Sequence, residues 1–338
     1  MLNKAIIDLE ILRNNAKNIK NKLPEKVKFN AVVKADAYGH GAPKVANALH
    51  NIVDCFSVAL VEEGVALRLS GVEKDILVLI PPFQSDLERA VNYNLTLSVA
   101  SIADAESIER EGGLQNKKVK VHIKHNSGMN RLGVDSLDDL NHIAEYIAAQ
   151  KHLVLDGLFS HLANPENKKD RINAQNNFLL ANNLVKGYNN KAICHLSASG
   201  GFLSGAYFDM VRIGILLYGY KPFESRAVSV QPIMKIYAPV IERRSLSKGQ
   251  CALYGFERAD CDTLITLIRY GYADGLPRRK VQGQFNNRCM DITALNNNVG
   301  KNTVCVMDNA DDIAADYGTI SYEVLTKSAF RAEKIYLN

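Results

Sequence analysis

The chain has 338 residues, of which 47% are hydrophobic and 23% charged, and this balance is typical of a globular protein. Its length is too great for one ordinary core, so we expect two domains or a barrel with an attachment. The net charge of +5 is spread along the chain and no apolar run approaches the roughly 20 residues that span a bilayer, so neither a nucleic-acid-binding arm nor a membrane segment is expected.

Short apolar, β-branched segments recur along the first two-thirds of the chain, and helical segments lie between most of them. The expected strands cover 29–35, 55–60, 75–80, 96–101, 118–125, 153–162, 191–199 and 208–219. Among the expected helices, 101–111, 137–150 and 171–185, the last has apolar residues among polar ones: Ile172, Phe178, Leu179, Leu180 and Leu184. Strands that alternate with helices predict right-handed βαβ units and a parallel sheet.

Eight such strands predict a closed (β/α)8 barrel over residues 1–225. An open doubly wound sheet is the main alternative, but no G-x-G-x-x-G sequence follows a strand to support it. After about residue 226 the sequence consists of strand-like segments joined by turns. These segments cover 234–242, 262–273, 289–295, 302–307 and 334–338. We therefore expect a second, mostly β domain over 226–338.

The cysteines and the N-terminal residues indicate the cellular compartment in which the protein is expected. Six scattered cysteines form no C-x-x-C pair, which favours reduced thiols over a disulfide framework or a zinc site. The chain starts with acidic and polar residues too early for a signal peptide. A cytoplasmic protein without a bound metal is expected.

Polar residues at the strand ends indicate an active site, because barrel enzymes build their sites at the carboxyl ends of the strands. The residues expected to meet there are Lys34, Lys124, Arg131, His161, His195, Ser199 and Arg212. Each has a plainer reading: Lys34 could lie in water, His161 could be a core histidine, and Arg212 could pair with Asp209. Their joint placement on one rim favours function.

The residue types narrow the chemistry. A desolvated lysine amine can form a Schiff base. The small residues Ser199, Gly200, Gly201 and Gly214 lie where barrels often hold a phosphate. Pyridoxal phosphate (PLP) fits this set. From residue types alone, a barrel that handles a phosphosugar fits about as well.

Seven stretches in order, from AVVKADAYGHG through VHIKHNSGMNRLGV, GLFSHLAN, MVRIGILLYG, IRYGYADGLPR and NRCMDI to GTISYEVLT, resemble the signatures of bacterial alanine racemases. The resemblance implies a barrel followed by a β domain, and a homodimer whose sites are completed by the partner. It implies interconversion of L- and D-alanine, which supplies D-alanine for peptidoglycan. Lys34 would hold PLP and act as the base on one face, and Tyr254 of the other subunit would act on the opposite face.

The resemblance also implies the remaining site residues. Arg212 would donate to the pyridine nitrogen, with His195 orienting it, and His161 would assist Tyr254. Arg131 would contact the ring hydroxyl side and the substrate carboxylate, and Lys124 matches a lysine that is often carbamylated. The implied phosphate ligands are Tyr38, Ser199, Gly214, Ile215 and Tyr322. The partner's Tyr272 and Met290 would line the substrate entrance.

Two departures from the family pattern concern the surroundings of the site. His125 and Asn126 replace the usual residue and aspartate after the modified lysine, and Ala198 replaces an asparagine near the phosphate. Three alternatives remain open: a racemase for serine, lysine or several amino acids, a PLP-dependent decarboxylase of related fold, and a non-enzymatic PLP-handling protein.

Overall fold

The computed structural model describes residues 2–254, 258–276, 278, 287–295 and 300–338. The chain forms two compact units. The barrel unit consists of Leu12–Ala37 and Ala42–Val230, and the β unit consists of Met1–Ile11, Tyr38–Gly41 and Gln231–Asn338.

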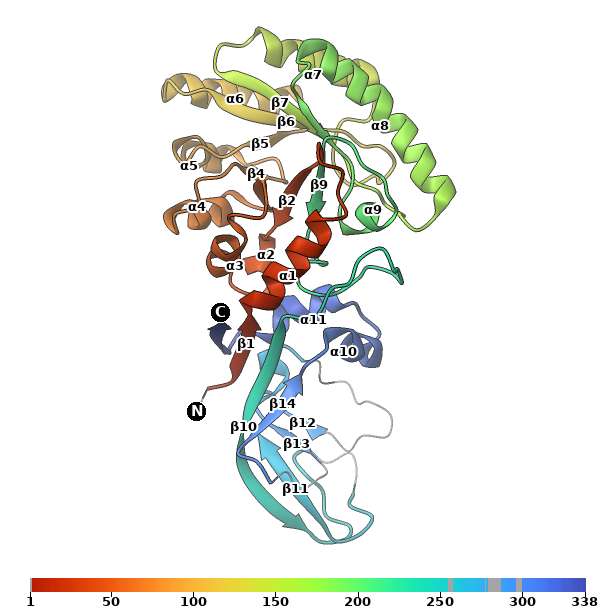
Figure 1. Cartoon of the computed structure of the whole chain (residues 1–338). Helices are drawn as coiled ribbons and strands as arrows, with labels where there is room; N and C mark the ends of the chain where they lie inside the picture. Colours follow the sequence, from red (N-terminus) through yellow and green to blue (C-terminus); the bar gives the residue numbers. More distant parts are fainter. Residues whose placement is uncertain (1, 255–257, 277, 279–286, 296–299) are drawn as a thin grey trace. The chain divides into compact units, whose positions relative to one another are not determined.

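Eight parallel strands close into a barrel (Figure 1). They are β2 (Lys28–Val32), β3 (Cys55–Val58), β4 (Ile76–Val78), β5 (Leu97–Val99), β6 (Val119–Lys124), β7 (Leu153–Phe159), β8 (Ile193–His195) and β9 (Met210–Ile213). The strands form two runs, β4-β3-β2-β9 and β5-β6-β7-β8. Backbone hydrogen bonds join these runs, from Val78 to Thr96 and from Arg212 to Ser197, each 2.9 Å long. The predicted barrel is confirmed, and the open sheet was the wrong alternative.

Helices follow the strands along the chain and surround the barrel in Figure 1. They are α3 (Ala42–Leu49), α4 (Val61–Leu69), α5 (Leu87–Asn92), α6 (Ile102–Leu114), α7 (Leu137–Ala149), α8 (Lys168–Tyr188) and α9 (Ser199–Leu203), while α1 (Leu9–Lys20) precedes β2. Local sequence explains where α6 and α7 begin. The hydroxyls of Ser101 and Ser136 accept from the backbone N–H groups three residues later, as N-caps do.

The buried face of α8 contains Phe178 but not the two leucines that follow it. Phe178, Ala181 and Val185 are buried, whereas Leu179 and Leu180 are 47% and 56% exposed. A helix turns about 100° per residue, so Leu180 points roughly 200° away from Phe178. The apolar residues of this segment therefore do not share one face, and the buried stripe uses the smaller Ala181 and Val185 instead.

The β unit is built on one mixed sheet. Its order is β12 (Asn287–Arg288), β13 (Thr293–Leu295), β11 (Thr263–Ile268), β10 (Met234–Leu246), β1 (Lys4–Asp8) and β15 (Glu333–Leu337), and β14 (Thr303–Met307) also pairs with β10. Two eight-residue helices, α10 (Ala310–Tyr317) and α11 (Ser321–Ser328), precede β15. The expectation of a mostly β second domain is confirmed.

The start of the chain belongs to this sheet. Strand β1 pairs antiparallel with β10 and parallel with β15, so residues expected in the barrel domain lie in the β unit. Its alternating burial, with Ala5 and Ile7 fully buried, matches a strand that packs one face on a core. Such long-range pairing leaves no local signal in the sequence.

Within the described residues, every helix is too short or too polar to cross a bilayer.

Candidate active site

Lys34 is separated from the end of β2 by Val33 alone and begins an unusual turn. The next four residues, Ala35 to Tyr38, all have positive φ angles between 50° and 55°. For L-residues this left-handed conformation costs roughly 1–2 kcal/mol each, and a run of four non-glycine residues is rare. Strain of this kind persists only where the surroundings enforce it, and it concentrates at functional sites.

Glu63, on α4, holds the turn in place. Its carboxylate accepts from the backbone N–H of Ala35 at 2.6 Å, and also from Ala59 at 2.7 Å and Leu60 at 3.1 Å. One carboxylate thus fixes both the residue after Lys34 and the start of its own helix. Hydrogen bonds to a charged acceptor are stronger than neutral ones, which suits a segment under strain.

Positive charge is concentrated at the strand ends. Burial, and then the charge of Arg131, lower the pKa of Lys34. Burial, followed by Arg131, Arg212 and Lys34, lowers the pKa of Lys124 to about 8. Lys124 is 6% exposed and donates to the carbonyl of Leu79 at 3.1 Å. A site with this excess of cations is suited to anionic ligands such as phosphate and carboxylate.

Burial and the positive charges at the strand ends also keep His161 neutral. Burial is the largest cause and Arg212 the next, and together with the other cations they lower the pKa of His161 to about 3. Its Nδ1 lies 3.5 Å from Nη2 of Arg212. Because arginine has only donors, this nitrogen is the acceptor of the contact, and Nε2 carries the proton of the neutral ring.

Arg212 is 3% exposed and its guanidinium is held on two sides. Nη1 donates to Nδ1 of His195 at 2.5 Å and to the His195 carbonyl at 3.0 Å. Nη2 donates to the carbonyls of Ser160 at 2.5 Å and Leu196 at 3.1 Å. Within the described part of the chain, Nε–H takes none of these bonds and stays available for a ligand acceptor.

The ring of Phe159, at the end of β7, contacts the side chains of His195, Lys124 and Arg212. The ring of His195 stacks on it with centroids 5.3 Å apart and planes 7° apart. Lys124 Nζ lies 5.2 Å and Arg212 Cζ 5.4 Å from the centroid of the Phe159 ring. These distances are within the range of cation–π attraction, so one apolar ring orders three polar groups.

Ser199 begins the short helix α9 and reaches the next strand connection. Its Oγ accepts from the backbone N–H of Gly214 at 3.1 Å, which leaves the hydroxyl proton to donate elsewhere. A Cβ added at Gly200 would lie 2.5 Å from Cγ of Pro165, so this helix requires its glycine for close packing. Ser199, Gly214 and Ile215 are thereby brought together, as the sequence predicted for a phosphate site.

The loop after Lys124 explains one departure from the family pattern. The Oδ1 atom of Asn126 accepts from the backbone N–H groups of Gly128 at 3.2 Å and Asn130 at 2.9 Å, and its amide donates to Asp135 at 2.6 Å. Asparagine therefore closes this loop without adding a charge. His125 Nδ1 contacts the carbonyl of Val134 at 2.9 Å, and burial lowers the pKa of His125, so its ring is neutral.

Five predicted residues lie in the β unit. Tyr38 and Tyr322, the latter on α11, have ring centroids 5.9 Å apart, and burial raises the pKa of Tyr322 to about 12. Both phenols are therefore protonated donors at neutral pH. Burial, and then Tyr322, also raise the pKa of Tyr38.

The remaining three form a second group. Tyr272 begins the 3-10 turn η2 (Tyr272–Asp274), and its N–H donates to the carbonyl of Cys289 at 3.1 Å, while Ala273 N–H donates to that of Met290 at 3.0 Å. The Cys289 thiol is hydrogen-bonded to the backbone of Tyr254. The side chains of Tyr254, Met290 and Tyr272 are 71%, 53% and 38% exposed. Backbone contacts thus link the segments that carry these three predicted residues, and all three side chains are exposed.

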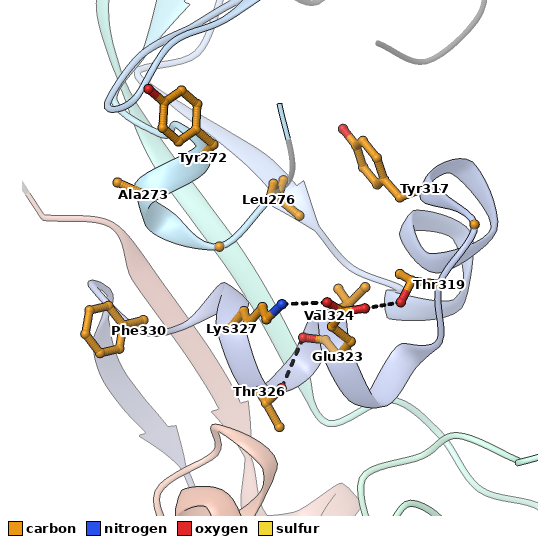
Figure 2. A pocket seen from close by; sticks show the side chains of 12 residues that line it. Tyr272, Ala273, Leu276, Tyr317, Thr319, Glu323, Val324, Thr326, Lys327 and Phe330 are labelled. Atoms are coloured by element: carbon orange, nitrogen blue, oxygen red, sulfur yellow. Dashed lines mark hydrogen bonds and ion pairs between the residues drawn. The ribbon is translucent and has the colours of Figure 1, made fainter. Parts of the chain in front are cut away.

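A cavity of about 630 Å³ lies beside this group in the β unit (Figure 2). Tyr272 lines one side and α11 the other, where Lys327 pairs with Glu323 at 2.5 Å. Glu323 also accepts from the Thr319 hydroxyl. All the residues that line this cavity belong to the β unit.

Sequence reasoning missed three contributors: Glu63, Phe159 and His122. His122 lies on β6, and its Nδ1 is 2.8 Å from Nε2 of His195. Only the position of His122 on a predicted strand, two residues before Lys124, could have drawn attention to it. Glu63 lies on a surface helix and Phe159 reads as an ordinary core residue, so neither has a local signal.

Comparison with known proteins gives a consistent result. The family model described as "Alanine racemase, N-terminal domain" matches residues 7–222, and "Alanine racemase, C-terminal domain" matches residues 233–336. The alanine racemase of Clostridium kluyveri is 33% identical over 368 residues, covering 98% of this chain and 93% of the relative. That of Francisella tularensis strain SCHU S4 is 35% identical over 290 residues, covering 82% and 77%.

Solved structures agree as well. The alanine racemase of Clostridium difficile 630 superposes with a TM-score of 0.93 at 29% identity, covering 100% of this chain and 96% of the other. The biosynthetic alanine racemase of Pseudomonas aeruginosa has a TM-score of 0.88 at 28% identity, covering 100% and 99%. The chain belongs to the alanine racemase family, whose members are isomerases.

Proposed function

We propose that this enzyme interconverts L- and D-alanine with PLP bound to Lys34. One observation carries the proposal: hydrogen bonds from Nη1 and Nη2 to His195, Ser160, Leu196 and His161 fix the guanidinium of Arg212. Its free Nε–H is a donor suited to the pyridine nitrogen, which is a neutral acceptor. A phosphosugar has no such ring nitrogen, so Arg212 favours PLP over that alternative.

The residues present fit PLP in type and in charge. Lys34 has a lowered pKa, which raises the share of nucleophilic amine, and the Ser199 hydroxyl with the Gly214 and Ile215 backbone would take the phosphate. Tyr38 and Tyr322 of the β unit would add phenol donors. When bound, PLP supplies an aldehyde for the amine and a ring that accepts electron density from the substrate Cα.

Racemisation needs one group on each face of the substrate Cα. Lys34 Nζ, once released from PLP, would take or return the proton on one face. Tyr254 of a second copy would do so on the other through its phenol oxygen. The neutral ring of His161 can accept from that phenol, and Arg212 supports His161 with its charge.

Arg212 would direct the outcome of the reaction. Burial, and then Arg131, lower the pKa of Arg212 to about 9, which still leaves it charged at pH 7. It can donate a hydrogen bond to the ring nitrogen but does not transfer its proton. By keeping the ring nitrogen unprotonated, Arg212 would limit the electron density that the cofactor withdraws and would favour return of the proton to Cα over transamination.

Arg131 and Lys124 would form the carboxylate side. A pKa of about 8 leaves roughly one Lys124 amine in ten unprotonated at pH 7, about 300 times more than at 10.5. Carbamylation requires this neutral amine and converts a cation that repels Arg131 into an anion that attracts it. Because His125 and Asn126 are neutral, they do not offset this change in the charge of Lys124.

A homodimer would complete the site. The β unit exposes the large side chains of Tyr254, Tyr272 and Met290, and also those of Ile320 and Phe330, at 60% and 83%. Large exposed apolar side chains are typical of interaction surfaces. A second copy would cover them and receive Tyr254 at its own Lys34. A cytoplasmic location and a role in supplying D-alanine for peptidoglycan belong to the same proposal. A racemase for serine, lysine or several amino acids is the alternative to it.

Reduction with borohydride tests the cofactor. Protein incubated with PLP and reduced should gain the mass of one pyridoxyl phosphate on the peptide that contains Lys34. The Lys34→Ala variant should gain none, and Lys4→Ala, which removes an exposed lysine of β1, should gain it as the wild type does. Absence of the label from wild-type protein would refute the proposal.

A further inference from the structure

A chain of hydrogen bonds runs from Arg212 into the barrel interior. Arg212 Nη1 contacts His195 Nδ1 at 2.5 Å, His195 Nε2 contacts His122 Nδ1 at 2.8 Å, and His122 Nε2 contacts Asp156 Oδ2 at 3.4 Å. His195 is fully buried and His122 is 3% exposed. His122 is thus linked to Arg212 through His195, and Asp156 is linked to it through His122.

Arg212, at one end of this chain of bonds, determines which atom donates and which accepts in each hydrogen bond. Arginine can only donate, so Nδ1 of His195 must accept and its proton lies on Nε2. His122 Nδ1 then accepts from His195, and the proton of His122 lies on Nε2, facing the Asp156 carboxylate. Each ring is thus in one tautomer, and a proton added to either ring would place two donors face to face.

The backbone of β7 is shaped for this contact. Pairing of β6 with β7 shifts register between Val121 and His122, so Asp156 is the extra residue of an irregularity. Such irregularities turn a side chain away from the direction that strict alternation would give it. Asp156 is thereby the acceptor for His122 although the next residue, Gly157, is the one that pairs with His122.

Gly157 makes room for the imidazole. A Cβ at this position would lie 2.5 Å from Cε1 and 2.6 Å from Nδ1 of His122, closer than side-chain contacts allow. The sequence Asp156–Gly157 therefore supplies both the acceptor for His122 and the space for its ring. A strand that served only to pack the core would require neither an acceptor at position 156 nor a glycine at position 157.

We propose that His122 and Asp156 are positioning residues, which hold His195 in the tautomer that accepts from Arg212 and so fix the guanidinium with Nε–H facing the ligand. This inference rests on the proposed function for what Arg212 contacts, but not for the chain of bonds itself. The charged groups around Asp156 agree with an ionised acceptor. Burial raises the pKa of Asp156, yet the hydrogen bond from His122 and the charges of Lys120 and Lys28 outweigh burial and lower it.

Nuclear magnetic resonance of the full-length protein, with 15N in histidine and arginine, tests the proposal without any cofactor. The wild type should show His195 with a bare Nδ1 and a slowly exchanging Nε2–H, together with resolved guanidinium signals of Arg212. His122→Phe removes the acceptor, so the Nε2–H signal should exchange with water and the Arg212 signals should broaden. Gly157→Ala, which displaces the ring of His122, should do the same.

Two variants of one residue separate positioning from general packing. Asp156→Asn keeps an oxygen that accepts from His122 and should retain all signals, whereas Asp156→Leu should lose them. Ser98→Ala is the matched control, because it removes another fully buried hydrogen bond of the barrel, to the Val78 carbonyl, outside the chain of bonds. Its spectrum should keep the His195 and Arg212 signals.

Activity gives a second readout. In PLP-loaded protein, His122→Phe and Asp156→Leu should lower turnover about tenfold to a hundredfold, as loss of an orienting partner does in metal sites, and Asp156→Asn should restore most of it. A folded His122→Phe protein with unchanged His195 and Arg212 signals would overturn the inference. If the wild-type protein racemises no amino acid, the proposed function is wrong, but the spectra still test the positioning role of His122 and Asp156.

Discussion

The strained turn after Lys34 makes Glu63 the most informative residue to change. Four left-handed residues at roughly 1–2 kcal/mol each store about 4–8 kcal/mol, and Glu63 is the side chain that accepts from the first of them, at 2.6 Å. A hydrogen bond to a charged group contributes about 1.5–3 kcal/mol, which is comparable to the strain of one or two residues of the turn. Glu63→Ala should therefore let the turn relax and move Lys34.

The expected effect is a loss of cofactor affinity. If the bond to Ala35 fixes Lys34, its loss should weaken PLP binding about tenfold to 150-fold, the equivalent of 1.5–3 kcal/mol. Titration of the cofactor-free protein with PLP, followed by absorbance, measures this. The free energy of unfolding in urea should also fall, because Ala59 and Leu60 lose their acceptor as well.

Glu62→Ala is the matched control on the same helix. Glu62 is 55% exposed and lies 3.9 Å from Arg89, a surface pair that contributes about 1 kcal/mol or less. It should bind PLP like the wild type. An affinity of Glu63→Ala within about twofold of the control would show that the turn does not depend on this carboxylate, and the reasoning would be refuted.

Other predictions follow from the charges of the site. With 13C-bicarbonate, a carbamate signal should grow as the pH rises through about 8, the pKa of Lys124, and be absent in Lys124→Ala; no signal at pH 9 would contradict carbamylation. The pKa of His161 is lowered to about 3, so its neutral form contributes stability above pH 6.5 that is lost as the pH falls toward 3. His161→Gln should therefore lose less stability than the wild type between pH 7 and 5 in urea titrations, and equal losses would contradict this. Mixed dimers of Lys34→Ala and Tyr254→Phe subunits should regain one intact site, and no recovery after proven subunit exchange would argue against a shared site.

The fold was predictable where its signal is local. Each barrel strand is a short β-branched run, and Lys34, Lys124 and His195 lie at or just beyond strand ends, where a barrel gathers its functional groups. The pairing of β1 with β10 and β15 joins segments more than 200 residues apart, so no window of sequence reveals it.

The backbone and the supporting residues of the site were less predictable. Nothing in Ala35, Asp36 and Ala37 suggests a left-handed turn, because alanine favours the right-handed helix. The bond from Glu63 that holds this turn connects residues 28 apart along the chain. His122 and Asp156 act through contacts between strands, which exist only once the barrel is closed.

Measurement of D-alanine formed from L-alanine by the PLP-loaded protein tests the central claim most directly. Chiral chromatography should show the two enantiomers approaching equal amounts from either direction, with serine, lysine and other amino acids run in parallel to define specificity. Lys34→Ala and Tyr254→Phe should each be inactive alone. Wild-type protein that carries PLP on Lys34 yet forms no D-alanine from L-alanine would contradict the account.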